Sequence, residues 1–556
     1  MTANGTADLA FVNGDVYTVD ASRRWASAVA VSEGAIVAVG TEAEIHTAIG
    51  TSTDVIDLRG RMLLPGFQDA HVHPPSSGFE MLHCNLSEAY SIEGYERIVA
   101  GYASDHPDDD PWIVGGGWSM DVFPSGNPPK DVLDRVVADR PVYLFSRDGH
   151  SVWVNSRALE IAGVTRETPD PSDGWIVRDV HGEPAGTLHE GAHRLVERHV
   201  PQPTTSEWIE GLRAAQRHLH SLGITAWQDA IVGGSTPTLD AYLAFAGSGE
   251  LTARVVGALW WDRDRGLEQI EDLVQARARG RVGRFVATSV KIMQDGVIEN
   301  HTAAVLEPYL DADGSPTDNR GRSFVDAEEL KACVTRLDSE GFQVHVHAIG
   351  ERGVREALDA FEAARTANGP NDLRHHIAHI QVVHPDDIPR FRALGVVANA
   401  QPLWAVNEGQ MLHLTIPFLG PERSGWQYPF GSLLRSGAVL AMGSDWSVSS
   451  ANPLWEMHVA VNRTAPSAYE YGGGTGDPFL PEERIDLPAA IAGFTINSAY
   501  VNHLDELTGS IEVGKRADLV VLDRNVFAHP AEEIADARVV LTLVDGERVF
   551  DAEAVE

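Results

Sequence analysis

The sequence has very little cysteine and very little lysine. Its 556 residues include two cysteines, Cys84 and Cys333, too few for a disulfide framework and not spaced for a Cys-based zinc site. Any metal must therefore be held by histidine, carboxylate or rarer ligands. Of the 43 basic residues only four are lysines, so a lysine in an unusual setting needs explaining; these are Lys130, Lys291, Lys331 and Lys515.

Long apolar segments are also absent. No run of about eighteen apolar residues occurs, and the N-terminal MTANGTADLAFVNGDVYTVD has neither a basic n-region nor an apolar h-region. We expect a soluble, cytoplasmic protein without a membrane partner. A net charge of -37 argues against nucleic acid as a partner, because the field would repel it. A hydrophobic content of 43% is typical of a globular chain with a large core.

Short strand patterns separated by Gly turns occupy both ends of the chain. DLAFVNGDVYTVD and ASAVAVSEGAIVAVG stand near the start, and GSIEVGKRADLVVLD and VVLTLVDGERVF near the end. We therefore predict that residues 1–64 and 505–556 form one composite β-sandwich domain.

Between these ends, apolar strand candidates alternate with helical patterns. The strand that carries His71 is followed by candidates at 223–230, 253–261, 287–296, 343–350, 375–381, 395–401 and 438–446. Eight strand-helix units predict an α/β fold, a closed (β/α)8 TIM barrel over residues 65–504. The gap after the first strand is too long for one crossover, so we expect residues 85–210 to form an inserted subdomain over the barrel mouth.

Histidine, lysine and aspartate recur where the barrel strands end. LLPGFQDAHVHPP places His71 and His73 two residues apart, which in a strand puts both on one face. His345 and His347 follow on the fifth strand, His375, His376 and His379 on the sixth, and Asp445 after the eighth. Because the carboxyl ends of barrel strands converge, this pattern predicts a metal site. The residues alone leave open whether His345 or His347 is the ligand.

Lys291 is the most informative of these residues. The strand ATSVKIM is otherwise apolar or small, and a buried ammonium is costly unless it is paired or modified. A neutral lysine amine can react with CO2 to give a carbamate, whereas arginine is not deprotonated in proteins. The alternative is a structural salt bridge from Lys291 to Asp295 or Glu299.

Several motifs together resemble the amidohydrolase superfamily, and more narrowly its YtcJ-like branch, which includes N-substituted formamide deformylases. They run nearly end to end: PGFQDAHVH, DGHSVWVNSRAL, KIMQDGVIENHTAAVLEPY, HAIGERGV, RHHIAHIQ, GSDWSVSSANPLWEM and TINSAYVNHLDELTGSIEVGKRADLVVLD. Where the branch usually has Asp, Glu and Pro, this chain has Glu351, Ala378 and Ser447. None of these three is an expected ligand, so they bear on substrate preference.

The resemblance implies a binuclear centre of two divalent metal ions, most simply zinc. It assigns His71 and His73 to one metal, His347 and His379 to the other, a carboxylated Lys291 to the bridge, and Asp445 to the first metal and to proton transfer. A metal-bound hydroxide would then hydrolyse a non-peptide C–N bond of a small molecule, such as an amide or N-formyl group. Barrels of this type often pair as homodimers, but the sequence itself does not give the oligomeric state.

Other functions fit parts of the same pattern. A deaminase with a single metal would need no strand-four lysine, and an ester, lactone or phosphotriester hydrolase would use the same centre. A scaffold without metals is disfavoured by the complete ligand set. Four residues lie in segments expected to rim the mouth: Trp118, His150, Trp404 and Trp446. An aromatic wall with few charges would suit an uncharged or aromatic amide. Packing between the insertion and the barrel is an equal alternative for the tryptophans, so no specific substrate is assigned.

Overall fold

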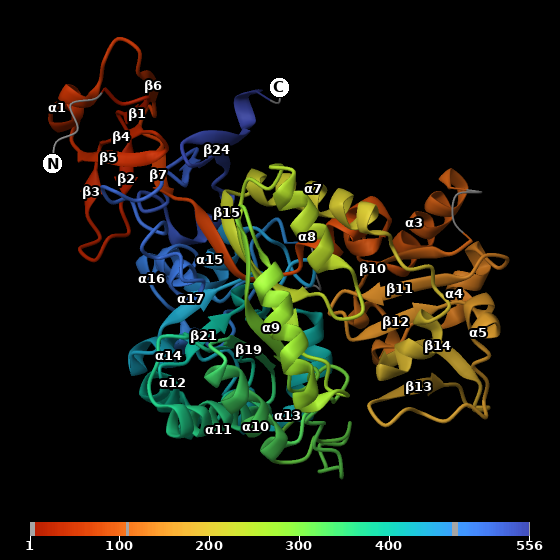
Figure 1. The fold of residues 1–556 in the computed structure, drawn as a ribbon. Coiled ribbons are helices and arrows are strands. Elements are labelled where there is room, and N and C mark those ends of the chain that lie inside the picture. The colour runs from red at the N-terminus through yellow and green to blue at the C-terminus, as the bar shows by residue number, and fades with distance from the viewer. Residues whose placement is uncertain (1–5, 107–110, 470–475, 555–556) are drawn as a thin grey trace.

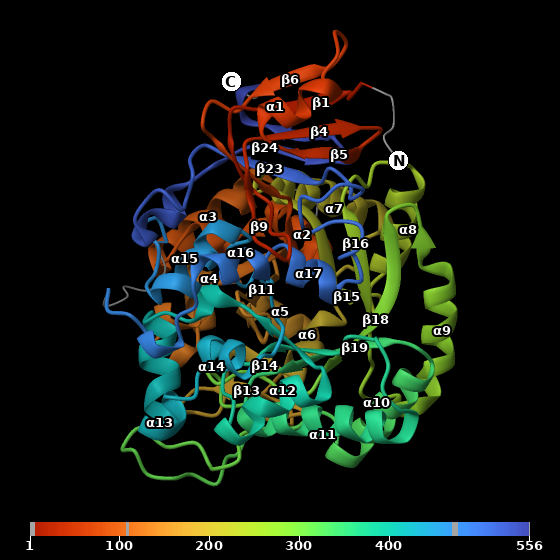
Figure 2. The same ribbon diagram turned by 90° about the vertical axis from the view of Figure 1, so that its left-hand side faces the viewer.

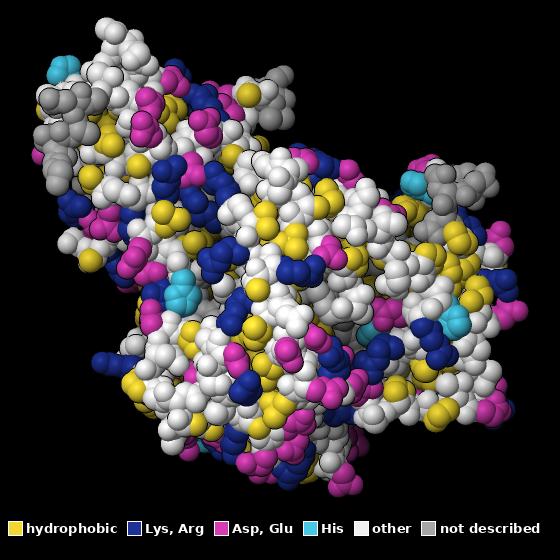
Figure 3. Space-filling view, in the orientation of Figure 1, with side chains coloured by type: hydrophobic (Ala, Val, Ile, Leu, Met, Phe, Trp, Pro, Cys, Tyr) yellow, Lys and Arg dark blue, Asp and Glu magenta, His cyan; other side chains and the backbone are white. Residues whose placement is uncertain are grey.

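The computed structural model describes residues 6–106, 111–469 and 476–554. Figure 1 shows three parts, with the terminal strands at one end, the barrel in the middle and the inserted sheet on the other side. In the described residues, no helix is both long and apolar enough to cross a membrane. On the face shown in Figure 3, arginines and lysines are interspersed with acidic side chains.

A nearly closed sheet of parallel strands forms the barrel, as predicted. In the described residues its eight parallel strands are β8 (Phe67–Val72), β15 (Ile224–Val232), β16 (Arg254–Trp260), β18 (Phe285–Met293), β19 (Gln343–Ala348), β20 (His376–His379), β21 (Val397–Ala400) and β22 (Leu440–Met442). A short strand, β17 (Arg281–Val282), pairs antiparallel with β18. The expected (β/α)8 fold is therefore confirmed, and each expected stretch contains an observed strand.

The barrel closes where the chain beyond β22 meets β8. The amide N–H of Asp445 donates to the His71 carbonyl at 2.8 Å, and that of His73 donates to the Trp446 carbonyl at 3.1 Å. The buried Asp69 carboxylate accepts the Ser444 hydroxyl at 2.6 Å and the backbone N–H groups of Ser444 and His71. The same contacts that close the barrel therefore hold the first strand and Asp445 together.

Helices between the strands cover the outside of the barrel (Figure 2). Local capping explains where several begin: Thr204 and Glu207 form a capping box, and Asp326 accepts two N–H groups at a helix start. The main helices are α2 (Pro74–Leu82), α7 (Thr205–Ser221), α8 (Thr238–Gly247), α9 (Ile270–Arg279), α10 (Ala327–Ser339), α11 (Glu351–Asn368), α12 (Ile388–Leu394), α13 (Ile416–Ser424), α14 (Phe430–Ser436), α15 (Pro453–Asn462), α16 (Leu487–Gly493) and α17 (Ile496–Val501).

Strands from both ends of the chain share one sheet. β7 (Met62–Pro65) pairs with β2 (Asp15–Tyr17) on one side and with β23 (Leu519–Leu522) on the other. That sheet also contains β3 (Trp25–Ala26), β24 (Val539–Val544) and β25 (Glu547–Asp551). The second sheet contains β1 (Leu9–Val12), β4 (Ala28–Ser32), β5 (Ala35–Gly40) and β6 (Asp54–Asp57). A shared apolar core joins N- and C-terminal residues, so the composite arrangement is as expected (Figure 2).

The insertion after β8 has a sheet and a core of its own. Its strands are β9 (Cys84–Asn85), β10 (Ile113–Trp118), β11 (Val142–Ser146), β12 (Ser151–Val154), β13 (Gly174–Arg178) and β14 (Pro184–Glu190). Helices α3 (Ile92–Asp105), α4 (Lys130–Val136), α5 (Ser156–Ala162) and α6 (Arg194–Glu197) accompany them. Because α7 packs against α2, we propose that the insertion ends before Thr205 rather than at residue 210.

The closest approach between α2 and α7 depends on glycine. A Cβ atom added at Gly78 would lie 1.9 Å from the Gly211 carbonyl oxygen, so Gly78→Ala must push the helices apart. We expect the unfolding free energy to fall by about 1–3 kcal/mol, the usual effect of overpacking. Calorimetry should show a lower Tm. The control is Gly101→Ala in α3, where a Cβ meets nothing within 4 Å and Tm should hold or rise. Equal Tm values in both variants would contradict this account.

Candidate metal centre

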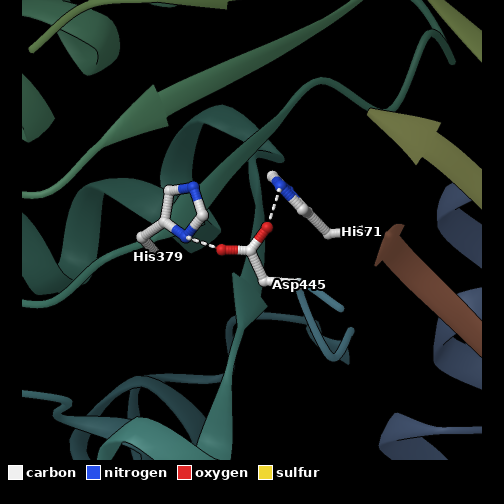
Figure 4. A group of neighbouring side chains, drawn as sticks. All are labelled: His71, His379 and Asp445. Atoms are coloured by element: carbon white, nitrogen blue, oxygen red, sulfur yellow. Dashed lines mark ion pairs between the residues drawn. The ribbon is translucent and has the colours of Figure 1, made fainter. Parts of the chain in front are cut away.

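Three buried side chains from different strands converge at the barrel mouth (Figure 4). His71 comes from the end of β8, His379 from the end of β20, and Asp445 from the turn after β22. One ligand atom from each lies within 4.8 Å of the others. Asp445 Oδ1 is 3.1 Å from His71 Nε2 and 2.9 Å from His73 Nε2, and its Oδ2 is 3.9 Å from His379 Nδ1. The two histidines of the first strand thus share one carboxylate oxygen.

This group suits a divalent cation. Burial and the Lys291 charge lower the pKa of His71 to about 3, so its ring is neutral at physiological pH and has a lone pair to offer. Burial opposes ionisation of Asp445, yet the neighbouring histidines hold its pKa well below the usual range. Metal bonds of about 2.0–2.1 Å at tetrahedral angles separate ligand atoms by about 3.3 Å, close to the spacing observed. His379 Nδ1 is buried without a hydrogen-bond partner, as an unused ligand atom would be.

Lys291 ends inside this group rather than in a salt bridge. Its Nζ lies 3.4 Å from His71 Nε2, and burial lowers its pKa to about 7. Asp295 instead accepts the backbone N–H groups of Ile349, Gly350 and Ala304, and Glu299 pairs with Thr415. Within the described residues neither carboxylate forms an ion pair with Lys291, so the structural alternative is not observed.

The structure separates the two histidines of β19. Both ring nitrogens of His345 have buried partners, Gln228 Oε1 at 2.6 Å from Nδ1 and His71 Nδ1 at 2.9 Å from Nε2. His347 lies beside His379, with ring centroids 4.4 Å apart, and its Nε2 faces the Gly296 carbonyl at 3.3 Å. Its Nε2 also lies 3.7 Å from Asp295 Oδ1, and the described contacts include no partner for its Nδ1. Among the described contacts, both ring nitrogens of His345 are therefore engaged, whereas Nδ1 of His347 is not.

The other strand-six histidines serve the scaffold. His375 Nε2 lies 2.9 Å from Asp338, and its Nδ1 accepts the backbone N–H of Val344. His376 is buried against His345, with ring centroids 3.9 Å apart, and its Nδ1 contacts the amide of Asn399. Neither side chain reaches Asp445 in the described contacts.

The insertion contributes a second buried pair next to the centre. His150 Nδ1 lies 3.0 Å from Glu190 Oε1, and the His150 ring centroid is 5.6 Å from that of His347. Glu190 also accepts from Thr302 and Asn300, in the loop after β18. Burial acts against protonation of His150, but the Glu190 carboxylate raises its pKa to about 9. This pair ties the inserted sheet to the barrel beside the proposed metal ligands.

A pocket adjoins the group through Trp404, whose ring stacks on that of His379 with the centroids 5.2 Å apart. Tyr428 and Tyr469 also line it, so part of the wall is aromatic. Four ionisable side chains line the same pocket, so its wall is more polar than expected: Arg147, Asp148, Glu299 and Glu408. Burial raises the pKa of Glu299 to about 7 and that of Glu408 to about 8. Asp148 and Glu299 lie in two of the motifs that carry the family resemblance.

Two tryptophans expected at the rim lie elsewhere. Trp118 is fully buried in the core of the insertion, where its indole N–H donates to the Leu144 carbonyl at 2.9 Å. Trp446 packs on His218, with ring centroids 4.8 Å apart, and contributes its backbone carbonyl to His73. Neither ring lines the cavity. Both are large apolar side chains that the structure uses for packing.

Sequence reasoning missed several polar residues of the site. Asp69, Gln228 and Asp229 lie in the expected strand stretches QDAHVH and TAWQDA, so their positions inside barrel strands were a usable signal. Burial raises the pKa of Asp229 to about 7. Glu190 gave no such signal, since its contact with His150 depends on how the inserted sheet folds.

The departures from the branch pattern have separate places in the fold. Glu351 is buried and accepts the backbone N–H of Leu306, and Ala378 pairs in register with His347. Ser447 donates its hydroxyl to Glu80. None of the three side chains contacts Asp445 in the described part of the chain.

Comparisons with known proteins identify the family of this chain. The sequence pattern of the Amidohydrolase family matches residues 54–550. Protein LONG AFTER FAR-RED 3 of Arabidopsis thaliana is 32% identical over 98% of this chain and 92% of its own length. The putative amidohydrolase YtcJ of Bacillus subtilis is 29% identical, over 97% and 98%. The N-substituted formamide deformylase of Arthrobacter pascens is 27% identical, over 97% of each.

Among solved structures, an uncharacterized metal-dependent hydrolase from Pyrococcus furiosus matches with a TM-score of 0.69. Its sequence is 26% identical, and the match covers 93% of this chain and 99% of the other. The resemblance stated from the motifs is thereby confirmed. This chain belongs to the Amidohydrolase family of metal-dependent hydrolases, and it is similar to YtcJ over nearly its full length.

Proposed function

We propose that this enzyme hydrolyses a non-peptide C–N bond of a small-molecule amide, with N-formyl amides as the leading substrate class. The observation that carries the proposal is the arrangement around Lys291 and Asp445. His71 lies on β8 and His73 directly follows that strand, while His347 and His379 lie on two other strands. The deformylase relative, matched over nearly its full length, supports the N-formyl class.

These side chains would hold two divalent metal ions. Zinc is the metal that best suits this set of nitrogen and oxygen ligands. His71, His73 and Asp445 would hold one, and His347 and His379 the other. Burial lowers the pKa of His71, His347 and His379, and the pKa of Asp445 is held below its usual range, so these four groups are in the protonation states that binding requires. When bound, such ions lower the pKa of coordinated water and polarise a carbonyl oxygen.

Lys291 would join the two halves as a carbamate. Its neutral Nζ adds to the carbon of CO2, a new N–C bond forms, and one proton leaves to solvent. A pKa near 7 makes the neutral amine available at physiological pH. The product is an anion with two oxygens at the end of a long stem. The negative charge of the carbamate would balance the positive charge of bound metal ions, whereas a bare ammonium would repel them.

Asp445 is the proposed proton carrier. Its Oδ1 lies 3.1 Å from His71 Nε2 and 2.9 Å from His73 Nε2. Its Oδ2 lies 3.9 Å from His379 Nδ1 and is less tightly engaged. Oδ2 would accept a proton from the attacking water and return it to the leaving nitrogen. Amide cleavage requires this return, because an unprotonated amine is a poor leaving group.

His150 and Trp404 are the proposed substrate contacts. Glu190 holds Nδ1 of His150, so the opposite nitrogen, Nε2, is the one that can meet a substrate beside His347. Trp404 stacks on His379 and lines the cavity, where its face can pack against an apolar substituent. An ester or lactone could use the same groups, whereas a mononuclear deaminase would leave Lys291 without a role.

Zinc binding should stabilise the folded protein. Protein stripped with a chelator should gain about 2.7 kcal/mol of unfolding free energy when free zinc is about a hundredfold above Kd. Thermal scans with and without zinc should therefore show a rise in Tm. Asp445→Ala should shrink that rise. His375→Ala is the control, since His375 contacts Asp338 rather than the site. An undiminished rise in Asp445→Ala would contradict the proposed ligand set.

Replacing Asp445 should reduce turnover more than it reduces the amount of bound metal. We expect Asp445→Ala to retain some bound metal yet lose about 10²–10⁴-fold in kcat, the usual contribution of a general acid–base group. The assay is formate release from N-formylbenzylamine, with metal measured in the same preparations. Full activity in Asp445→Ala would refute the proton-transfer role. No release by wild type from any N-formyl amine would refute the substrate class.

A further inference from the structure

A chain of buried side chains runs below the proposed metal ligands toward the opposite end of the barrel. It starts at Gln343, whose Nε2 donates to the Val501 carbonyl at 2.6 Å and to the Arg374 carbonyl at 2.9 Å. A backbone carbonyl can only accept, so the NH2 group of Gln343 must face these two oxygens. Its Oε1 is thereby turned toward Gln228.

Gln228 is oriented in the same way. Its Nε2 donates to Gln343 Oε1 at 3.0 Å and to Asn502 Oδ1 at 2.9 Å. With both amide protons used, Gln228 Oε1 is left as an acceptor. It lies 2.6 Å from Nδ1 of His345, so that nitrogen carries a proton and donates.

The orientation passes from His345 to His71. His345 is completely buried and contacts no carboxylate in the described part of the chain, so its ring carries a single proton. That proton is on Nδ1, which leaves Nε2 as an acceptor. The partner of Nε2 is His71 Nδ1 at 2.9 Å, which must therefore be the donor. The lone pair of His71 is left on Nε2, the atom that faces Asp445 at 3.1 Å.

We propose that Gln343, Gln228 and His345, here called the positioning relay, fix the tautomer of His71 and so prepare Nε2 for the metal. The inference rests on the metal centre proposed above. It gives the HVH sequence of β19 two different duties: His347 is a ligand, and His345 orients a ligand from another strand. It also gives a role to Val501 and Asn502, which lie far from the barrel mouth.

Packing alone would not require this pattern. His376 is equally buried and stacks against His345, yet its described partner is Asn399 rather than a proposed ligand. His376 is therefore the matched control. Replacing His376 with Phe removes buried ring nitrogens whose described partner is Asn399. Replacing His345 with Phe removes Nε2, the acceptor of the His71 Nδ1 proton.

The test measures metal affinity of the full-length protein, by titrating stripped protein with cobalt(II) against a competing chelator and recording the visible absorption of the bound ion. We expect His345→Phe to weaken binding by about 10–100-fold, as lost support of a metal ligand usually does. His376→Phe should bind as wild type does. His345→Gln, which restores an acceptor near the Nε2 position, should recover most of the lost affinity.

Equal affinities for His345→Phe and His376→Phe would overturn the relay. If His345→Phe does not fold, Gln228→Leu decides instead: it leaves His345 in place but removes its acceptor, so affinity must fall if the relay acts and stay at the wild-type value if it does not. Failure of wild type itself to bind cobalt would count against the proposed metal centre, whereas normal binding in wild type and all variants would count against the relay alone.

Discussion

The contact of Asp445 with the first barrel strand is the interaction on which the site depends. Its backbone N–H bonds to the His71 carbonyl, and one oxygen of its carboxylate lies against both His71 and His73. Asp69 reinforces the junction from below through Ser444. Closing the barrel and assembling the ligand group are therefore one structural event, because the last strand brings Asp445 to the first.

Burial gives the site its chemistry. In water Lys291 would be an ammonium and the histidines would be partly protonated, but desolvation shifts each toward its neutral form. Neutral nitrogen donors around one ionised carboxylate are poorly matched to an apolar core and well matched to a cation. The barrel interior tolerates these polar groups because amide side chains such as Gln228 and Gln343 form hydrogen bonds in the layer below them.

The fold could be predicted because its signals are local. Apolar strands alternate with capped helices, and a spacing of two puts His71 and His73 on one face whatever surrounds them. Asp445 was predictable from its position after the last strand. His345 and His347 have the same spacing, however, and only Gln228, from another strand, distinguishes them. The positions of Trp118, Arg147 and Asp148 depend on how the inserted sheet packs, which no nearby residue specifies.

The central claim is that Lys291 bridges two metal ions, and metal content per chain tests it most directly. Wild type and Lys291→Ala would be purified side by side with zinc and bicarbonate present, and analysed by elemental mass spectrometry against protein concentration. The account predicts two ions per wild-type chain and one or none in the variant. One ion in both proteins would contradict the bridge and favour a mononuclear centre like that of a deaminase.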